Sequence, residues 1–225
     1  TYLMRDADQR LADVAQRTAA LYSLYLKERR TELDNLASSP TVVAAAEASN
    51  RESARRNLTR LSAAQVEATY RATHSMQVDA GAEAYLRAVA GRSDFVALSL
   101  TDANGFTGVT TRSGGDAVHS DEPWWQSTMR QGTYTSEPRV DDATGALSLE
   151  IASVVTARVG GRPVGVLSGV FDLRRLGRLV ATSDAHTGAA VEVIDARGRL
   201  VLGRDSARVL KALPNVDSIP RADTV

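Results

Sequence analysis

The sequence contains no cysteine. Without thiolates the chain cannot hold an iron–sulfur cluster or a zinc–cysteine site, it has no thiol nucleophile, and no disulfide braces its fold. It also lacks any run of 18 or more apolar residues, so we expect no segment of it to cross a membrane, and no signal peptide opens it. Because the chain starts at Thr1 and stops inside a polar stretch, we expect it to be part of a longer protein.

An excess of one charge is missing too. Lys and Arg together number 27, and so do Asp and Glu, which leaves a formal net charge of zero. A protein that binds nucleic acid needs a cationic surface to displace counterions, so we do not expect nucleic acid as a partner. Apolar residues make up 43% of the chain, which is enough for a hydrophobic core, and 225 residues fit one large domain or two small ones.

Glycine and proline are both absent between Tyr2 and Leu36. Apolar or small side chains recur there every three or four positions, which predicts one long amphipathic helix. Such a helix measures about 50 Å at 1.5 Å per residue, more than the width of a small domain. We therefore expect a stalk or a dimerisation helix that pairs in a parallel homodimer. A long core helix with frayed ends is the alternative.

Shorter helices and then strands are expected after Pro40, which ends the long helix. The helices cover residues 41–48, 51–73 and 82–90, with Ser49 and Asn50 capping the second of these. From Phe95 the pattern changes to strands and turns. Strands are expected over 95–100, 106–111, 135–140, 147–159 and 164–171, and a short helix over 123–130. The fold class is therefore α+β, one mostly antiparallel five-stranded sheet with flanking helices.

A turn of the form Asp-Ala-x-Gly occurs twice, at residues 102–105 and again 93 positions later at 195–198. An apolar strand stands on each side of both turns, and a helix precedes each unit, over 172–180 for the second. The recurrence indicates a duplicated module. The second copy is expected to be incomplete, because only strands 189–194 and 200–203 and a helix over 206–213 remain for it.

No catalytic constellation is visible. The histidines His74, His119 and His186 stand far apart and outside any metal or base motif, and no phosphate loop or nucleophile elbow occurs. We expect no enzymatic activity, metal or cofactor, although a hydrolase with an unrecognised site is one alternative. What stands out is Trp124-Trp125, the only two tryptophans. Neighbouring helix residues point about 100° apart, so one ring can face the core and the other a small-molecule pocket; core packing of both rings is the alternative.

In order along the chain, these features resemble a known family. The elements that carry the resemblance are the long helix, the hairpin turn at 102–105, Asp121–Trp125, Tyr134-x-Ser136-x-Pro138-x-x-Asp141-x-x-Thr144-Gly145, and Gly165-Val166-Leu167. This order resembles the double Cache (PDC-type, PAS-like) extracytoplasmic sensor domains of bacterial chemoreceptors and sensor histidine kinases. The resemblance covers residues 1–205, roughly.

The resemblance implies an organisation and a function. It implies a stalk or dimerisation helix with a helical subdomain over residues 1–90, a membrane-distal ligand-binding module over 91–172, and a linker helix with a partial membrane-proximal module over 173–225. The chain would then be the periplasmic sensing part of an inner-membrane signalling receptor, anchored only by segments outside this sequence. It would bind a small molecule and signal along the N-terminal helix. A non-sensing oligomerisation or adhesion module is the alternative from another class.

The resemblance also implies a set of site residues. Family members that bind amino acids place an Arg two residues before an aromatic pair, and an Asp in the strand after Ser-x-Pro. The aromatic pair and the Asp are matched here, but Glu122 stands at the Arg position. We expect a ligand site built from Trp124, Trp125, Tyr134, Arg139 and Asp141, with His119 and Arg112 in a loop over it. The ligand we favour is a small organic carboxylate such as acetate held by Arg139; an amine or amino acid is the alternative.

Overall fold

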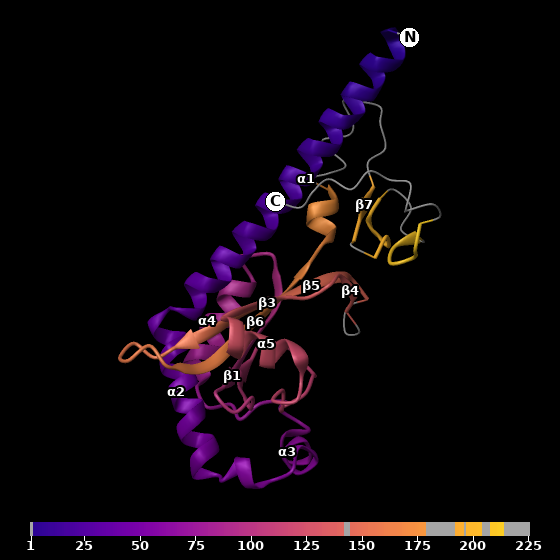
Figure 1. The fold of residues 1–225 in the computed structure, drawn as a ribbon. Coiled ribbons are helices and arrows are strands. Elements are labelled where there is room, and N and C mark those ends of the chain that lie inside the picture. The colour runs from indigo at the N-terminus through magenta and orange to yellow at the C-terminus, as the bar shows by residue number, and fades with distance from the viewer. Residues whose placement is uncertain (1, 142–144, 179–191, 196, 204–207, 214–225) are drawn as a thin grey trace.

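The computed structural model describes residues 2–141, 145–178, 192–195, 197–203 and 208–213. One long helix runs diagonally past a sheet, and shorter helices surround the sheet's lower end (Figure 1). The helices are α1 (Tyr2–Ala37), α2 (Pro40–Arg55), the 3₁₀ turn η1 (Leu58–Arg60), α3 (Ala63–Tyr70), α4 (Ala80–Ala90) and α5 (Pro123–Gln131). The strands are β1 (Phe95–Asp102), β2 (Thr107–Thr110), β3 (Thr133–Thr135), β4 (Arg139–Val140), β5 (Leu147–Thr156), β6 (Pro163–Asp172), β7 (Val193–Ile194) and β8 (Leu200–Leu202).

The main sheet is antiparallel and confirms the predicted α+β class. Its order is β2-β1-β6-β5-β3, with β4 also pairing β5, so it has six strands and not the expected five. The sixth arises because the strand predicted over 135–140 is two short strands on either side of Pro138. Proline has no N–H to donate, and the ladder with β5 is interrupted between Thr135 and Arg139.

The two faces of this sheet differ because side chains alternate along each strand. One face is covered by α1, α2 and α4 and holds the main hydrophobic core, which includes Leu98, Leu100, Leu149, Ile151, Leu167 and Phe171. The opposite face carries α5 at one end, where Trp125 packs on Ala152 and Val166. The rest of that face carries the polar side chains of Ser99, Glu150 and Ser168 beside Ala97 and Val170.

Helix α1 confirms the predicted long helix. Its 36 residues span about 54 Å at 1.5 Å per residue, and its N-terminal half extends beyond the main sheet (Figure 1). Leu33 fixes the other half, because it is fully buried in the core against β6. Gly169 of β6 makes this close approach possible, since a Cβ there would lie 3.1 Å from Leu33 Cδ1 and 2.6 Å from the Phe95 ring.

The second and third helices differ from the prediction. Helix α2 continues through Ser49 and Asn50 to Arg55, so these residues are not caps. The Ser49 hydroxyl donates to Ala45 O at 2.8 Å, and the Asn50 amide donates to Ala46 O and, at 2.6 Å, to Val164 O of β6. The single helix predicted over 51–73 is wrong: Asn57, with φ of 53°, turns the chain after α2, and η1 and α3 follow.

The C-terminal part is a small hairpin, β7–β8, whose side chains join the core beside α1. Its turn repeats the hydrogen bonds of the first one. Asp102 Oδ1 accepts from the N–H groups two and four residues later at 2.8 and 3.0 Å, and Asp195 Oδ1 does so at 2.9 Å for both. The duplicated turn in the sequence therefore corresponds to a duplicated hydrogen-bond pattern.

Other predictions for this part are only partly covered by the described residues. Residues 174–178 are helical, whereas 179–180 and 189–191 lie outside the described residues. The helix predicted over 206–213 is wrong for 208–213, which form turns and a bridge from Ala212 to Arg199; positions 206 and 207 are not described. Among the described residues, we find no helix whose length and hydropathy would suit a membrane span.

The burial of Leu33 generates a test of how α1 is attached. We expect Leu33→Ala to lower the free energy of unfolding by about 2–5 kcal/mol, because it leaves a cavity between the helix and the sheet. Urea denaturation followed by circular dichroism measures the change. The matched control is Leu61→Ala, which truncates a side chain that is 39% exposed and should cost less than about 1 kcal/mol. Equal losses in the two variants would contradict this attachment.

Candidate functional site

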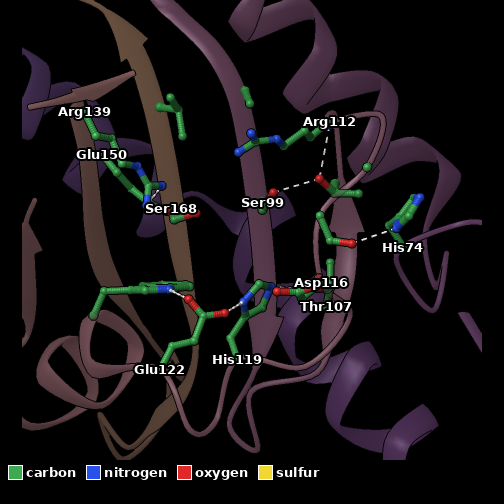
Figure 2. Close-up of a pocket in the computed structure, with 16 residues that line it drawn as sticks. His74, Ser99, Thr107, Arg112, Asp116, His119, Glu122, Arg139, Glu150 and Ser168 are labelled. Atoms are coloured by element: carbon green, nitrogen blue, oxygen red, sulfur yellow. Dashed lines mark hydrogen bonds and ion pairs between the residues drawn. The ribbon is translucent and has the colours of Figure 1, made fainter. Parts of the chain in front are cut away.

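A cavity of about 210 Å³ lies between the polar face of the sheet and the segment that links β2 to α5. Ser99 of β1, Glu150 of β5 and Ser168 of β6 line it from the sheet, and Arg112, Asp116 and His119 line it from the linking segment (Figure 2). His74, which precedes α4, and Thr107 of β2 close one side. The cavity is thus walled mostly by hydrogen-bonding and charged groups.

At one end of the cavity, Glu122 forms hydrogen bonds with two neighbouring side chains. Its Oε1 lies 2.5 Å from His119 Nδ1, and its Oε2 accepts from Trp124 Nε1 at 2.5 Å. His119 Nε2 lies 3.1 Å from Thr107 Oγ1, and the His119 ring lies 5.3 Å from that of Trp124 between centroids. Burial alone would raise the pKa of Glu122, but these hydrogen bonds and the charge of Arg139 outweigh it and leave the pKa below its ordinary value. Glu122 is therefore a carboxylate at neutral pH.

A second carboxylate, Glu150, lies on another wall of the cavity. Its Oε2 accepts from Arg139 Nη2 at 2.8 Å, and the hydroxyl of Ser168 also hydrogen-bonds to it. Burial raises the pKa of Glu150, and the nearby Glu122 adds to the rise, against the opposing effects of Arg139 and Ser168. Arg139 is 54% exposed at its side chain, whereas the Glu150 side chain is 10% exposed, so the acid is the inner member of the pair.

Arg112 reaches into the cavity from the linking segment (Figure 2). Its Nη2 donates to Asp141 Oδ2 at 2.7 Å, and Asp141 itself does not line the cavity. The side chain of Asp141 is only 4% exposed. This buried carboxylate thus fixes the Arg112 guanidinium from outside the cavity.

Hydrogen bonds to Glu67 of α3 and to His74 hold the linking segment in place. The Glu67 carboxylate accepts from the N–H groups of Ala117 and Val118, each at 2.8 Å, and His74 Nδ1 lies 2.7 Å from Gly115 O. Gly114 and Gly115 have φ of 104° and 107°, which favours glycine at both positions. These contacts and backbone conformations give the linking segment a defined position as one wall of the cavity.

The structure brings four of the seven predicted site residues to the cavity lining: Arg112, His119, Trp124 and Arg139. Asp141 contacts one of them, Arg112, from outside the cavity.

The other two predicted residues lie beside α5. Tyr134 packs beside Trp125 there, and the pKa of Tyr134 is raised by burial and by nearby Glu150. Trp125 is buried in a small cluster with Ala152 and Val166, where its Nε1 donates to Thr101 Oγ1 at 2.9 Å. Of the four residues predicted to converge on one cavity, Arg139 lines this cavity, whereas Trp125, Tyr134 and Asp141 are not among its lining residues.

Several lining residues went unnoticed in the sequence. Glu150, Ser168 and Ser99 stand on three different strands and belong to no local motif. Their only sequence signal is that polar residues interrupt otherwise apolar strands, and alternation then places them on one face. Among the described residues there is no group of three or more acidic or histidine side chains placed to hold a metal ion.

Comparison with known proteins identifies the architecture. No protein-family model matches the chain. The ligand-binding domain of the Pseudomonas aeruginosa chemoreceptor PctC, solved with GABA, superposes with a TM-score of 0.62 at 21% identity over 92% of this chain and 80% of that one. The chain has the fold of chemoreceptor ligand-binding domains. The fold that the resemblance implied is therefore confirmed.

Two further relatives agree with the chemoreceptor fold. The ligand-binding domain of the Pseudomonas fluorescens chemoreceptor CtaA, solved with L-serine, gives a TM-score of 0.61 at 21% identity over 93% of this chain and 78% of that one. A stretch of 95 residues is 30% identical to the methyl-accepting chemotaxis protein PctB of Pseudomonas aeruginosa, and it covers 42% of this chain and 15% of that receptor. All three names describe chemoreceptors or their sensor domains, which agrees with the expectation that the chain is not an enzyme.

The different surroundings of the two tryptophans generate a test. We expect Trp125→Phe to lower the free energy of unfolding by about 1–3 kcal/mol, because it removes a buried hydrogen bond to Thr101 and part of the ring's packing. Trp124→Phe also removes a hydrogen bond, to Glu122, but this ring is partly exposed at the cavity, where water can replace the lost donor, so the cost should be less than about 1 kcal/mol. Thermal and urea unfolding measure both variants, and a larger loss for Trp124→Phe would contradict the assignment.

Proposed function

We propose that this chain is the extracytoplasmic ligand-sensing domain of a membrane-anchored chemoreceptor or sensor kinase, and that it binds an amino acid in the cavity beside Arg112. The observation that carries the proposal is the mixed charge of the cavity wall, where guanidinium and carboxylate groups stand on different sides. A zwitterion complements both kinds of group. The solved domains of the same fold, bound to GABA and L-serine, support this ligand class.

The same charges argue against the organic acid that the sequence favoured. A ligand such as acetate would bring its carboxylate into a cavity already lined by Asp116, Glu122 and Glu150. Like charges at close range in a partly buried site repel strongly. The ammonium group of an amino acid would instead be attracted to these carboxylates. The proposed function therefore adopts the alternative ligand class, the amino acid.

We assign the ligand's carboxylate to Arg112. A guanidinium has five N–H donors, and the pair with Asp141 uses Nη2. Because Asp141 stands outside the cavity, it orients Arg112 without presenting its own charge to the ligand. The ligand's ammonium group would then lie toward Glu122 and Trp124, where a carboxylate and an aromatic face both favour a cation.

The proposal includes a route from the cavity to α1. Strand β5 carries Glu150 on the cavity side and Ser153 on the helix side, and the Ser153 hydroxyl donates to the carboxylate of Asp34 in α1. Ligand binding that displaces β5 would thereby act on the long helix. The division into residues 1–90, 91–172 and 173–225 belongs to this proposal, and the matching turns at Asp102 and Asp195 support two related modules.

The Arg112 assignment can be tested by calorimetry. We expect GABA, L-serine or L-arginine to bind the wild-type domain, and Arg112→Ala to weaken that binding by about ten- to a hundred-fold through loss of a charged hydrogen bond. The matched control is Arg162→Ala, an exposed arginine outside the cavity that should leave affinity unchanged. If acetate bound tightly and none of the amino acids bound, the proposed ligand class would be wrong. If both variants lost the same affinity, the assignment of the ligand carboxylate to Arg112 would be wrong.

The proposed homodimer involves α1. Leu21 and Leu24 are 37% and 53% exposed on this helix, which leaves apolar surface for a second copy. We expect sedimentation to show weak, concentration-dependent dimers, and Leu24→Glu to reduce them, because it places like charges opposite each other in a parallel pair. A strict monomer at every concentration would contradict the pairing.

A further inference from the structure

Glu150 differs from the other acidic residues of the cavity in its position. It stands on β5, an inner strand of the sheet, its carboxylate is nearly buried, and it both lines the cavity and pairs with Arg139. Its backbone is fixed as well, since its N–H donates to Ser136 Oγ at 3.0 Å and its C=O accepts from Ser136 N–H at 2.8 Å. The side chain is thus presented to the cavity by a rigid element.

The pair of Glu150 with Arg139 has the chemistry of a bound ligand. A carboxylate accepts a charged hydrogen bond of 2.8 Å from a guanidinium and a second hydrogen bond from the Ser168 hydroxyl. These are the contacts that a small carboxylic acid would make at this wall. The place that the sequence predicts for a ligand carboxylate, next to Arg139, is therefore filled by a side chain of the protein.

The two arginines of the cavity differ in this respect. Asp141 holds Arg112 from outside the lining, so its carboxylate is not one of the groups that face the cavity. Glu150 belongs to the lining and is the more buried partner of Arg139, so its charge faces the ligand. Arg112 is thus paired with an acid behind the cavity wall, whereas Arg139 is paired with an acid that itself faces the cavity.

We propose that Glu150 is a built-in carboxylate that occupies Arg139 and thereby makes the site reject ligands whose only charged group is a carboxylate. The inference rests on the proposed function, because it concerns the ligand class of the same cavity. It assigns Glu150 as a specificity-determining residue. Removing its charge should open a second anion subsite between Arg139 and Ser168.

The test compares acetate and propionate binding by calorimetry at neutral pH in the wild type, Glu150→Gln and Glu150→Ala. The Gln variant keeps the shape and removes the charge, and the Ala variant leaves a space that acetate can fill. We expect both variants to bind acetate at least about ten-fold more tightly than the wild type, because Arg139 regains a charged partner. The matched control is Glu137→Gln, a 53% exposed acid outside the cavity, which should not change acetate binding.

A double variant shows whether the gain passes through Arg139. Adding Arg139→Gln to Glu150→Gln should abolish the gain. Acetate affinity within two-fold of the wild type in both single variants, or a gain that survives the loss of Arg139, would overturn the inference. Thermal unfolding verifies that each variant is folded, and Glu150→Ala decides the outcome if Glu150→Gln is not.

The proposed amino-acid ligand is tested by a separate measurement. GABA, L-serine and L-arginine titrated into the wild type report on the amino-acid site alone, whatever acetate does in the variants. If no amino acid binds, the proposed ligand class is rejected while the acetate comparison still decides the role of Glu150. If an amino acid binds and acetate affinity does not change, only the inference about Glu150 is rejected.

Discussion

The pairing of β5 with β6 is the interaction on which the rest of this structure depends. Its antiparallel register sets Ile151 opposite Gly169 and Ala152 opposite Ser168, and so decides which side chains face the helices and which face the cavity. Because side chains alternate along a strand, a slip of one residue would send Glu150 into the hydrophobic core and Ile151 into the cavity. One register therefore builds the core and the site together.

The long helix is joined to this sheet at a few buried points. Leu33 fills the space above Gly169, and Asp94 at the start of β1 accepts from the Tyr25 hydroxyl at 3.1 Å and from Arg29 Nη1 at 2.9 Å. Arg175, just after β6, pairs with the same carboxylate. Asp94 thus ties together α1, the sheet and the segment that leads to the second hairpin. A displacement of the sheet would reach α1 through these contacts.

The charged side chains in and behind the cavity wall are paired with other groups of the protein. Glu122 is satisfied by His119 and Trp124, Glu150 by Arg139 and Ser168, and Arg112 by Asp141. Burying charged groups is costly unless they are paired or hydrogen-bonded, and these contacts supply the partners. Under the proposed function, the same contacts would also determine which ligands the cavity accepts.

The sequence by itself determined the long helix, most strands and their order, because helix periodicity, strand alternation and turn chemistry are local; it did not show that α2 continues to Arg55 or that the chain turns at Asn57. The long helix over 2–36 and the Asp-Ala-x-Gly turns were predictable for this reason, and the resemblance pointed to the sensor-domain fold. What the sequence could not decide was which of two adjacent tryptophans borders the cavity, or that Arg139 meets Glu150 and Arg112 meets Asp141. Those partners are 11 and 29 residues apart in the chain. Their meeting depends on strand register and on the path of the linking segment, which only the tertiary structure fixes.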